Sequence, residues 1–124
     1  MSDNVGAIDS VYDRAALLEN FEGMEEVVVD IIQSYEENVP GLKERITNAI
    51  EASDASALQL AAHTLKGVLS NFYAERARSL AYKLEDMGKV GDLTHALTSW
   101  HSLCTELTLL NLALQKLASE LRPI

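Results

Sequence analysis

The sequence predicts an all-α protein, an antiparallel four-helix bundle with one or two additional short N-terminal helices. Three observations support this fold class. The chain has only two prolines and six glycines in 124 residues, and it is rich in the good helix formers alanine, leucine and glutamate. Apolar residues recur every three or four positions through most of the chain, as they do on the buried face of a helix. The breaks between these stretches are short, so neighbouring helices should pack antiparallel.

Length and composition predict one domain. A chain of 124 residues with 48% apolar residues can build a single hydrophobic core but is short for two. Residues 1–10 are polar and contain a glycine, and we expect them to form a flexible N-terminus. Residues 11–124 then form the single helical domain, in which no internal repeat or linker is evident.

Two helices are expected in the N-terminal part of the chain. The first is short, with Asp9 or Ser10 as its cap. The pair Glu22 and Gly23 then breaks the apolar pattern. The second helix, about 24–38, has apolar residues three and four apart, and the glutamates in its first turn complement the helix dipole.

A proline predicts a break between the second and third helices. Pro40 lacks the N–H that a helix interior needs, and it suits the first turn of a new helix. The third helix therefore covers about 41–52. Ser53 and Asp54 form a linker, and Asp54 is the expected N-cap of the fourth helix, about 55–72.

Two further helices complete the expected bundle. The fifth covers about 74–87, and residues 88–91, with a glycine at each end, form the turn after it. Asp92 is the expected N-cap of a long last helix, about 93–121, which has leucines along its length. At about 1.5 Å per residue, this helix is long enough to span the whole bundle.

The net charge of −9 restricts the classes of partner. Nucleic-acid binding and attraction to an anionic membrane both need concentrated lysine and arginine, so we expect neither. No stretch approaches the roughly 18 apolar residues of a membrane span, and the first residues lack the pattern of a signal peptide. The single cysteine, Cys104, excludes an internal disulfide and fits a reducing compartment. We therefore expect a cytoplasmic protein whose partners are proteins.

The fourth helix presents a histidine away from its apolar face. Its apolar residues are spaced 4, 3, 4 and 3 apart from Leu58 to Phe72, and His63 lies roughly 140° from the middle of this seam. Lys66 and Gly67 fall on the same outer face. A glycine inside a helix costs about 1 kcal/mol relative to alanine, so Gly67 indicates that something must approach the histidine closely. The outer face also includes Gln59, Leu60 and Ser70.

The segment AAHTLKG at 61–67 is followed by an Asn-aromatic turn and a second helix beginning AERARSLAYKLE. It resembles the histidine phosphotransfer (HPt) domains of bacterial multistep phosphorelays. The centre of the resemblance is His-x-x-Lys-Gly, here His63, Lys66 and Gly67, and it extends from about Leu17 to Leu121. The resemblance implies a bundle that accepts a phosphoryl group on His63 from a receiver-domain aspartate and passes it to another receiver in a two-component phosphorelay.

The resemblance also implies roles for individual residues. Lys66 would stabilise the phosphoryl charge. Glu85, on the next helix, would accept a proton from the imidazole and favour the tautomer whose outward nitrogen attacks. The surface on which the receiver docks would be formed by Gln59, Leu60, Gly67 and Ser70. This chain departs from the family after the histidine helix, where bulky residues replace the small ones that are common there: Val68, Leu69, Phe72 and Tyr73.

We expect a phosphocarrier rather than an enzyme with its own kinase site. The sequence has no glycine-rich nucleotide loop or P-loop, and 124 residues leave no room for an ATP-binding domain. By resemblance, its partners are receiver domains of response regulators or hybrid histidine kinases. Those receivers would supply magnesium, so no cofactor is expected in this chain.

Two alternatives fit the same sequence. A non-phosphorylated helical adaptor would bind a receiver or kinase domain through the same surface, and it would be indifferent to the loss of His63. A dimerising bundle would pair the excess length of the last helix between two chains, whereas we expect a monomer. No metal site is expected, because His95 and His101 are six residues apart and do not share a helix face as a ligand pair does. Trp100 and Cys104 are expected to be core residues.

Overall fold

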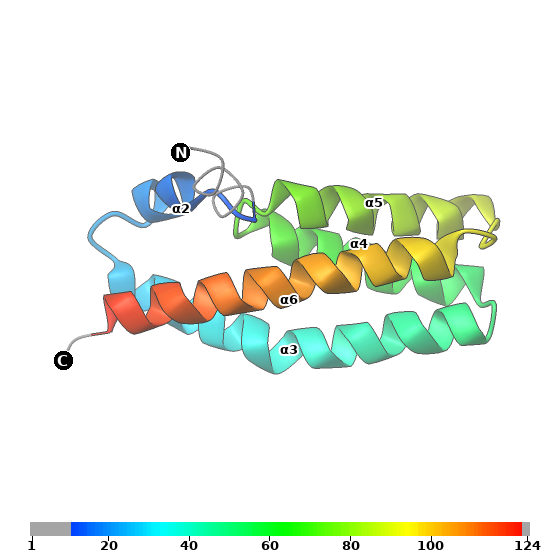
Figure 1. Cartoon of the computed structure of the whole chain (residues 1–124), viewed down its shortest axis with the longest axis horizontal. Coiled ribbons are helices and arrows are strands. Elements are labelled where there is room, and N and C mark those ends of the chain that lie inside the picture. The colour runs from blue at the N-terminus through cyan, green and yellow to red at the C-terminus, as the bar shows by residue number, and fades with distance from the viewer. Residues whose placement is uncertain (1–10, 123–124) are drawn as a thin grey trace.

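The computed structural model describes residues 11–122, which form five helices and no strand. Four long helices form an antiparallel bundle, and a short helix lies at one end of it (Figure 1). The predicted all-α bundle with a short N-terminal helix is therefore confirmed. In chain order the helices are α2 (Arg14–Asn20), α3 (Glu25–Glu51), α4 (Ala55–Ser70), α5 (Glu75–Val90) and α6 (Ala96–Leu121).

The short helix α2 begins immediately after Asp13, whose side chain accepts a hydrogen bond of 3.0 Å from a backbone N–H of the first turn. Asp9 and Ser10, the predicted caps, lie outside the described residues, as does the expected flexible segment 1–10. Leu17 is the fully buried residue of α2. Leu17 and the partly buried Leu18 connect the helix to the core of the bundle.

Two polar contacts tie α2 to the bundle. The backbone N–H of Asp13 donates to the carbonyl of Tyr73, in the turn between α4 and α5, at 3.0 Å. Arg14 pairs with Glu120, near the end of α6, at 2.7 Å. The helix consequently lies beside the end of the bundle where α3 begins and α6 ends (Figure 1).

Pro40 does not divide the second predicted helix from the third, and this prediction was wrong. The chain continues through the proline as one helix of 27 residues, α3. An interior proline costs about 3 kcal/mol, but burying each large aliphatic side chain beyond it contributes about 1.5–3 kcal/mol. Pro40 itself is exposed. The buried residues keep one uninterrupted spacing on both sides of it: Val28, Ile32, Tyr35, Val39, Leu42, Ile46 and Ala49.

The histidine helix α4 begins as predicted, with Asp54 as its N-cap, and ends at Ser70, two residues before the predicted end. The predicted turn at residues 88–91 was wrong, because Gly88 lies inside α5 and is buried. A Cβ atom on Gly88 would lie 2.6 Å from the carbonyl oxygen of Ala55 in α4. The glycine therefore allows the two helix backbones to approach each other. Gly91, with a φ of +86°, ends α5 instead.

The last helix begins three residues later than predicted, at Ala96, and His95 is its N-cap residue. Asp92 does not cap it. Its carboxylate instead accepts hydrogen bonds from the backbone N–H and the hydroxyl of Thr94, at 3.1 and 2.6 Å, within the preceding loop. An aspartate that bonds two residues ahead forms a turn of its own and delays the helix.

The core runs along the inside of the four long helices. Trp100 is buried, as predicted, and its indole N–H donates to the hydroxyl of Thr47 in α3 at 3.2 Å. Cys104 is partly buried at the edge of the core. Small residues dominate the buried side of α5. The buried residues of α5 are Ala77, Ala81, Leu84 and Gly88.

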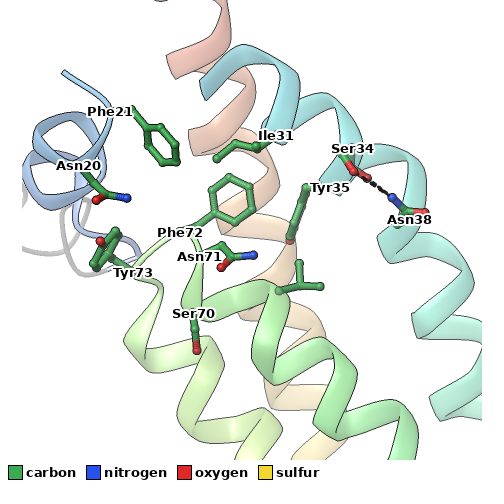
Figure 2. A pocket seen from close by; sticks show the side chains of 11 residues that line it. Asn20, Phe21, Ile31, Ser34, Tyr35, Asn38, Ser70, Asn71, Phe72 and Tyr73 are labelled. Atoms are coloured by element: carbon green, nitrogen blue, oxygen red, sulfur yellow. Dashed lines mark hydrogen bonds between the residues drawn. The ribbon is translucent and has the colours of Figure 1, made fainter. Parts of the chain in front are cut away.

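An open hollow of about 480 Å³ lies between α2, α3 and the turn after α4 (Figure 2). Phe21, Ile31 and Phe72 supply much of its apolar lining, and the Phe72 ring packs edge-on against that of Tyr35. Among residues 11–122, the titratable side chains that line it are tyrosines, and burial raises the pKa of Tyr35 above its ordinary range. Within the described part of the chain, its lining contains no carboxylate, histidine, lysine or arginine.

Candidate functional site

His63 lies on the outer face of α4, where its side chain is 63% exposed. Its neighbours Ala62 and Leu65 are buried in the core and fix the rotation of the helix. Because the bundle determines which way α4 faces, the imidazole is presented to solvent from a rigid element. Such an imidazole can meet a reactive group on another protein.

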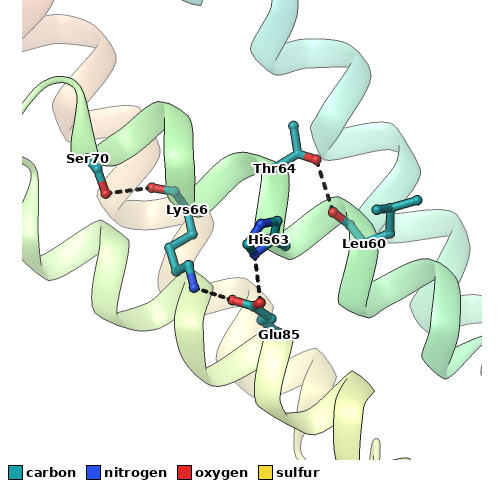
Figure 3. A network of polar contacts seen from close by, with 6 residues as sticks. All are labelled: Leu60, His63, Thr64, Lys66, Ser70 and Glu85. Carbon is teal, nitrogen blue, oxygen red and sulfur yellow. Dashed lines mark hydrogen bonds and ion pairs between the residues drawn. The ribbon is translucent and has the colours of Figure 1, made fainter.

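Glu85 of α5 bridges His63 and Lys66 (Figure 3). One carboxylate oxygen, Oε2, lies 2.8 Å from Nδ1 of His63, and the other, Oε1, lies 2.7 Å from Nζ of Lys66. The side chain of Glu85 is only 16% exposed, and that of Lys66 is 23% exposed. The structure thus brings together the three residues that the sequence singled out for the chemistry.

The protonation state of Glu85 determines which imidazole nitrogen is free. Burial alone would raise the pKa of Glu85, but the hydrogen bonds from Lys66 and His63 outweigh it and hold the pKa below the ordinary value of 4.5. An ionised carboxylate can only accept hydrogen bonds, so a neutral His63 carries its proton on Nδ1. The other nitrogen, Nε2, then has a free electron pair.

The lowered pKa of Glu85 predicts a loss of stability in acid. A carboxylate with a lower pKa in the folded than in the unfolded protein stabilises the fold above the unfolded value, and this contribution disappears as the pH falls through the folded value. The stabilisation by Glu85 should therefore be complete above pH 4.5 and lost below it. Urea unfolding of the protein and of Glu85→Gln at pH 7 and in acid measures this. The difference between their unfolding free energies should shrink in acid, and a difference that grows would contradict the assignment.

The predicted docking residues surround His63 without crowding it. Leu60 is 60% exposed, and together with Gln59, His63 and Glu85 it lines an open hollow of about 440 Å³. Gly67 is exposed, and apart from its chain neighbours and its own helix backbone no atom of the described residues lies within 4 Å of the position that its Cβ would occupy. The surface around the histidine is therefore open to a partner.

Ser70 lies further along the same face but has a bond of its own. Its hydroxyl donates to the backbone carbonyl of Lys66 in the same helix, at 3.0 Å (Figure 3). Thr64 makes the equivalent bond to the carbonyl of Leu60, at 3.1 Å. These hydroxyl protons are directed into the helix rather than toward His63.

The sequence analysis missed Tyr82, which is 53% exposed on α5. The centroid of its ring lies 5.2 Å from Nζ of Lys66. Tyr82 precedes Glu85 by three residues, so the two share a helix face. This three-residue spacing could have identified Tyr82 from the sequence, because residues three apart on a helix lie on the same face.

The other candidates lie away from this site or are inert. His95 and His101 are exposed, and residues 11–122 contain no group of three or more histidine, cysteine, aspartate or glutamate side chains placed to hold a metal ion. Burial raises the pKa of Cys104, an effect that nearby Lys43 only partly offsets. The sequence analysis did not foresee this basic neighbour, but the thiolate is still disfavoured.

A comparison with protein-family models matches the Hpt domain over residues 30–122, which is most of the chain. The chain belongs to the Hpt domain family. This Hpt domain is therefore a histidine phosphotransfer protein of the kind that acts in phosphorelays, where Hpt domains are phosphocarriers that interact with receiver domains. The family and the general function predicted from the sequence are thus confirmed.

The fold of this Hpt domain also resembles a solved structure. The crystal structure of histidine-containing phosphotransfer protein B (HptB) from Pseudomonas aeruginosa PAO1 matches it with a TM-score of 0.76 and 25% sequence identity. The match covers 90% of this chain and 96% of that one. No match was found among curated proteins. No helix in residues 11–122 is both long and apolar enough to cross a membrane.

Proposed function

We propose that His63 of this Hpt domain accepts a phosphoryl group from an aspartyl phosphate of one receiver domain and passes it to another. The contact of 2.8 Å between Nδ1 of His63 and Glu85 is the main support. It holds the proton on Nδ1 and leaves Nε2 free on an exposed side chain. On this basis we assign His63 as the phosphorylated residue, Lys66 and Glu85 as the residues that assist it, and the surface around them as the docking surface.

The transfer step follows from the geometry. Nε2 attacks phosphorus and forms an N–P bond, while the P–O bond to the receiver's aspartate breaks and its electron pair leaves with the carboxylate. The proton on Nδ1 stays in place. The imidazole ring gains positive charge as the bond forms, and the adjacent carboxylate of Glu85 stabilises that charge. Reversing the same step delivers the phosphoryl group to a second receiver.

Lys66 would compensate for the charge of the phosphoryl group. An ammonium group acts as a flexible point charge, so it can pair with phosphoryl oxygens without a fixed approach direction. Lys66 follows His63 by three residues on α4, and its ammonium already lies beside Glu85. It therefore stands within one side-chain length of the group that His63 would carry.

The docking surface would consist of Gln59, Leu60, Gly67 and Ser70 around the histidine. Leu60 supplies exposed apolar area, and Gly67 supplies clearance. The receiver would bring the magnesium ion and the acidic pocket that hold the phosphoryl group on its own aspartate. A cytoplasmic location and a monomeric state remain predictions from the sequence.

Transfer from a panel of phosphorylated receiver domains tests this function. The protein should become labelled by at least one receiver, and the product should be labile in acid and stable in alkali, as a phosphohistidine is. A product with the opposite stability would show phosphorylation of another residue type. Binding without any transfer, across a panel that contains the cognate receiver, would favour the helical adaptor instead.

The substitution Gly67→Leu tests the clearance around His63. The protein should fold normally, because no atom lies within 4 Å of the position of the new Cβ. Transfer from a receiver should slow by about tenfold, which corresponds to a loss of about 1.4 kcal/mol in docking. Initial rates of labelling measure the effect, and Gly67→Ala is the matched control with a much smaller side chain. An unchanged rate in Gly67→Leu would contradict the proposal that Gly67 leaves space for a receiver to approach His63.

A further inference from the structure

Tyr82 lies beside the network of His63, Lys66 and Glu85 but is not explained by their roles. Its side chain is half exposed, while the centroid of its ring lies 5.2 Å from Nζ of Lys66. Glu85, one turn further along α5, lies 2.7 Å from the same ammonium group. Lys66 therefore has two partners on one helix face, one ionic and one aromatic.

The contact with the ring lies within the range of a cation–π interaction. The face of an aromatic ring attracts a cation within about 6 Å of its centroid, and it does so more strongly where water is partly excluded. The side chain of Lys66 is only 23% exposed. Much of the Lys66 side chain is thus covered by the protein, and a cation near a ring is attracted more strongly where water is excluded.

The two partners of Lys66 differ in how they constrain it. Glu85 holds the ammonium group on the side of Nδ1, whereas a phosphoryl group on His63 is bonded to Nε2. To reach the phosphoryl oxygens, Lys66 has to leave one oxygen of Glu85. A hydrogen bond depends steeply on its direction, but the attraction to a ring extends over the ring's whole face. The ammonium group can therefore move against the ring without being released into solvent.

We propose that Tyr82 is a positioning residue, whose ring holds the Lys66 ammonium group while it exchanges Glu85 for the oxygens of the phosphoryl group on His63. The proposal rests on the proposed function of His63 and extends it to a residue that does not touch the reacting atoms. Tyr82 would act through Lys66 alone. Its removal should therefore slow phosphorylation even when no receiver domain is present.

Labelling by inorganic phosphoramidate separates positioning from docking, because no partner protein takes part. The P–N bond of phosphoramidate breaks, ammonia leaves with the electron pair, and phosphorus forms its new bond to Nε2 of His63. Tyr82→Leu keeps apolar bulk but removes the ring, and it should slow labelling by about fivefold. Tyr82→Phe keeps the ring and should stay within about twofold of the unmodified protein. Equal slowing in the two variants, or no slowing in Tyr82→Leu, would overturn the proposal.

A double-mutant cycle with Lys66→Met tests whether Tyr82 acts through the lysine. Two residues that act through one interaction are not additive, so Tyr82→Leu should cause no further slowing in the Lys66→Met background. The same fold-change in both backgrounds would overturn the positioning role. Proton NMR gives an independent measurement: the ring current of Tyr82 should shift the ε-methylene protons of Lys66 upfield, and this shift should disappear in Tyr82→Leu but not in Tyr82→Phe.

The outcomes also separate this proposal from the function on which it rests. If neither phosphoramidate nor any phosphorylated receiver labels His63 in the unmodified protein, the proposed function fails and the role of Tyr82 fails with it. If the unmodified protein is labelled and Tyr82→Leu is labelled at the same rate, only the role of Tyr82 is overturned.

Discussion

Replacing His63 with glutamine should abolish phosphoryl transfer to the protein and leave its helical circular dichroism spectrum unchanged. An amide has no free electron pair of comparable nucleophilicity, so no N–P bond can form at this position. The imidazole side chain is 63% exposed and fills no part of the core. A surface substitution of this kind usually changes the free energy of unfolding by no more than about 0.5 kcal/mol. The chemistry should therefore be lost while the fold is retained.

The matched control for this experiment is His101→Gln. His101 is also an exposed histidine on a long helix, but it lies on α6. Labelling should be unaffected in this variant, measured with the same phosphorylated receiver. If labelling survived in His63→Gln, or disappeared in His101→Gln, His63 would not be the phosphorylated residue.

The substitution Gly88→Ala should destabilise the protein strongly for so small a change. The added Cβ would lie 2.6 Å from two backbone atoms of α4, the oxygen of Ala55 and the nitrogen of Gln59. Backbone atoms cannot move aside as a side chain can, so α4 and α5 have to separate. Overpacking of this kind costs about 1–3 kcal/mol, and we expect it to exceed the gain of about 1 kcal/mol from better helix propensity. Urea unfolding followed by circular dichroism measures the net change.

Gly67→Ala provides the opposite case in the same pair of helices. Gly67 also lies inside a helix, but a Cβ there meets no atom within 4 Å. Helix propensity should then act alone and raise the free energy of unfolding by about 1 kcal/mol. If Gly88→Ala were stabilised to the same extent as Gly67→Ala, the close contact of α5 with α4 would be disproved.

The sequence was sufficient to predict the elements whose apolar pattern is regular. Asp54 was identified as the cap of the histidine helix, because an aspartate just before a regular apolar seam has few other roles. The helix break predicted at Pro40 was wrong because only the local effect of the proline was considered. The apolar residues before and after it were not compared as one continuous pattern. Tyr35, Val39 and Leu42 keep the spacing of one helix across the proline. Burial of that common face, a tertiary effect, decided the outcome.

Gly88 and Gly91 show why the end of α5 was misplaced. Both are glycines, and a sequence does not distinguish one that ends a helix from one that lets two helices touch. Gly91 has a φ of +86° and ends α5, whereas Gly88 packs against the backbone of α4. The difference depends on a neighbour more than 25 residues away in the chain, Gln59. Local pattern contains no information on that contact.

The residues of the candidate site differ in how far the sequence alone could identify them. His63 could be identified because it breaks the apolar pattern of its own helix, and Lys66 and Gly67 because they share its face. Glu85 required the family resemblance, since no spacing within one helix relates it to His63. Tyr82 was missed because its importance depends on a contact between α5 and the side chain of Lys66.

The close contact of α4 with α5 at Gly88 affects how the conformation of this Hpt domain could differ with and without a phosphoryl group on His63. At Gly88 the backbones of α4 and α5 are in close contact, because a Cβ atom there would lie 2.6 Å from the oxygen of Ala55. We therefore expect the spacing of α4 and α5 beside His63 and Glu85 to change little when His63 carries a phosphoryl group. The phosphorylated and unphosphorylated forms would then share one backbone shape and differ by about two negative charges. On the proposed function, a receiver would then distinguish the two forms by their surface charge rather than by a change of conformation.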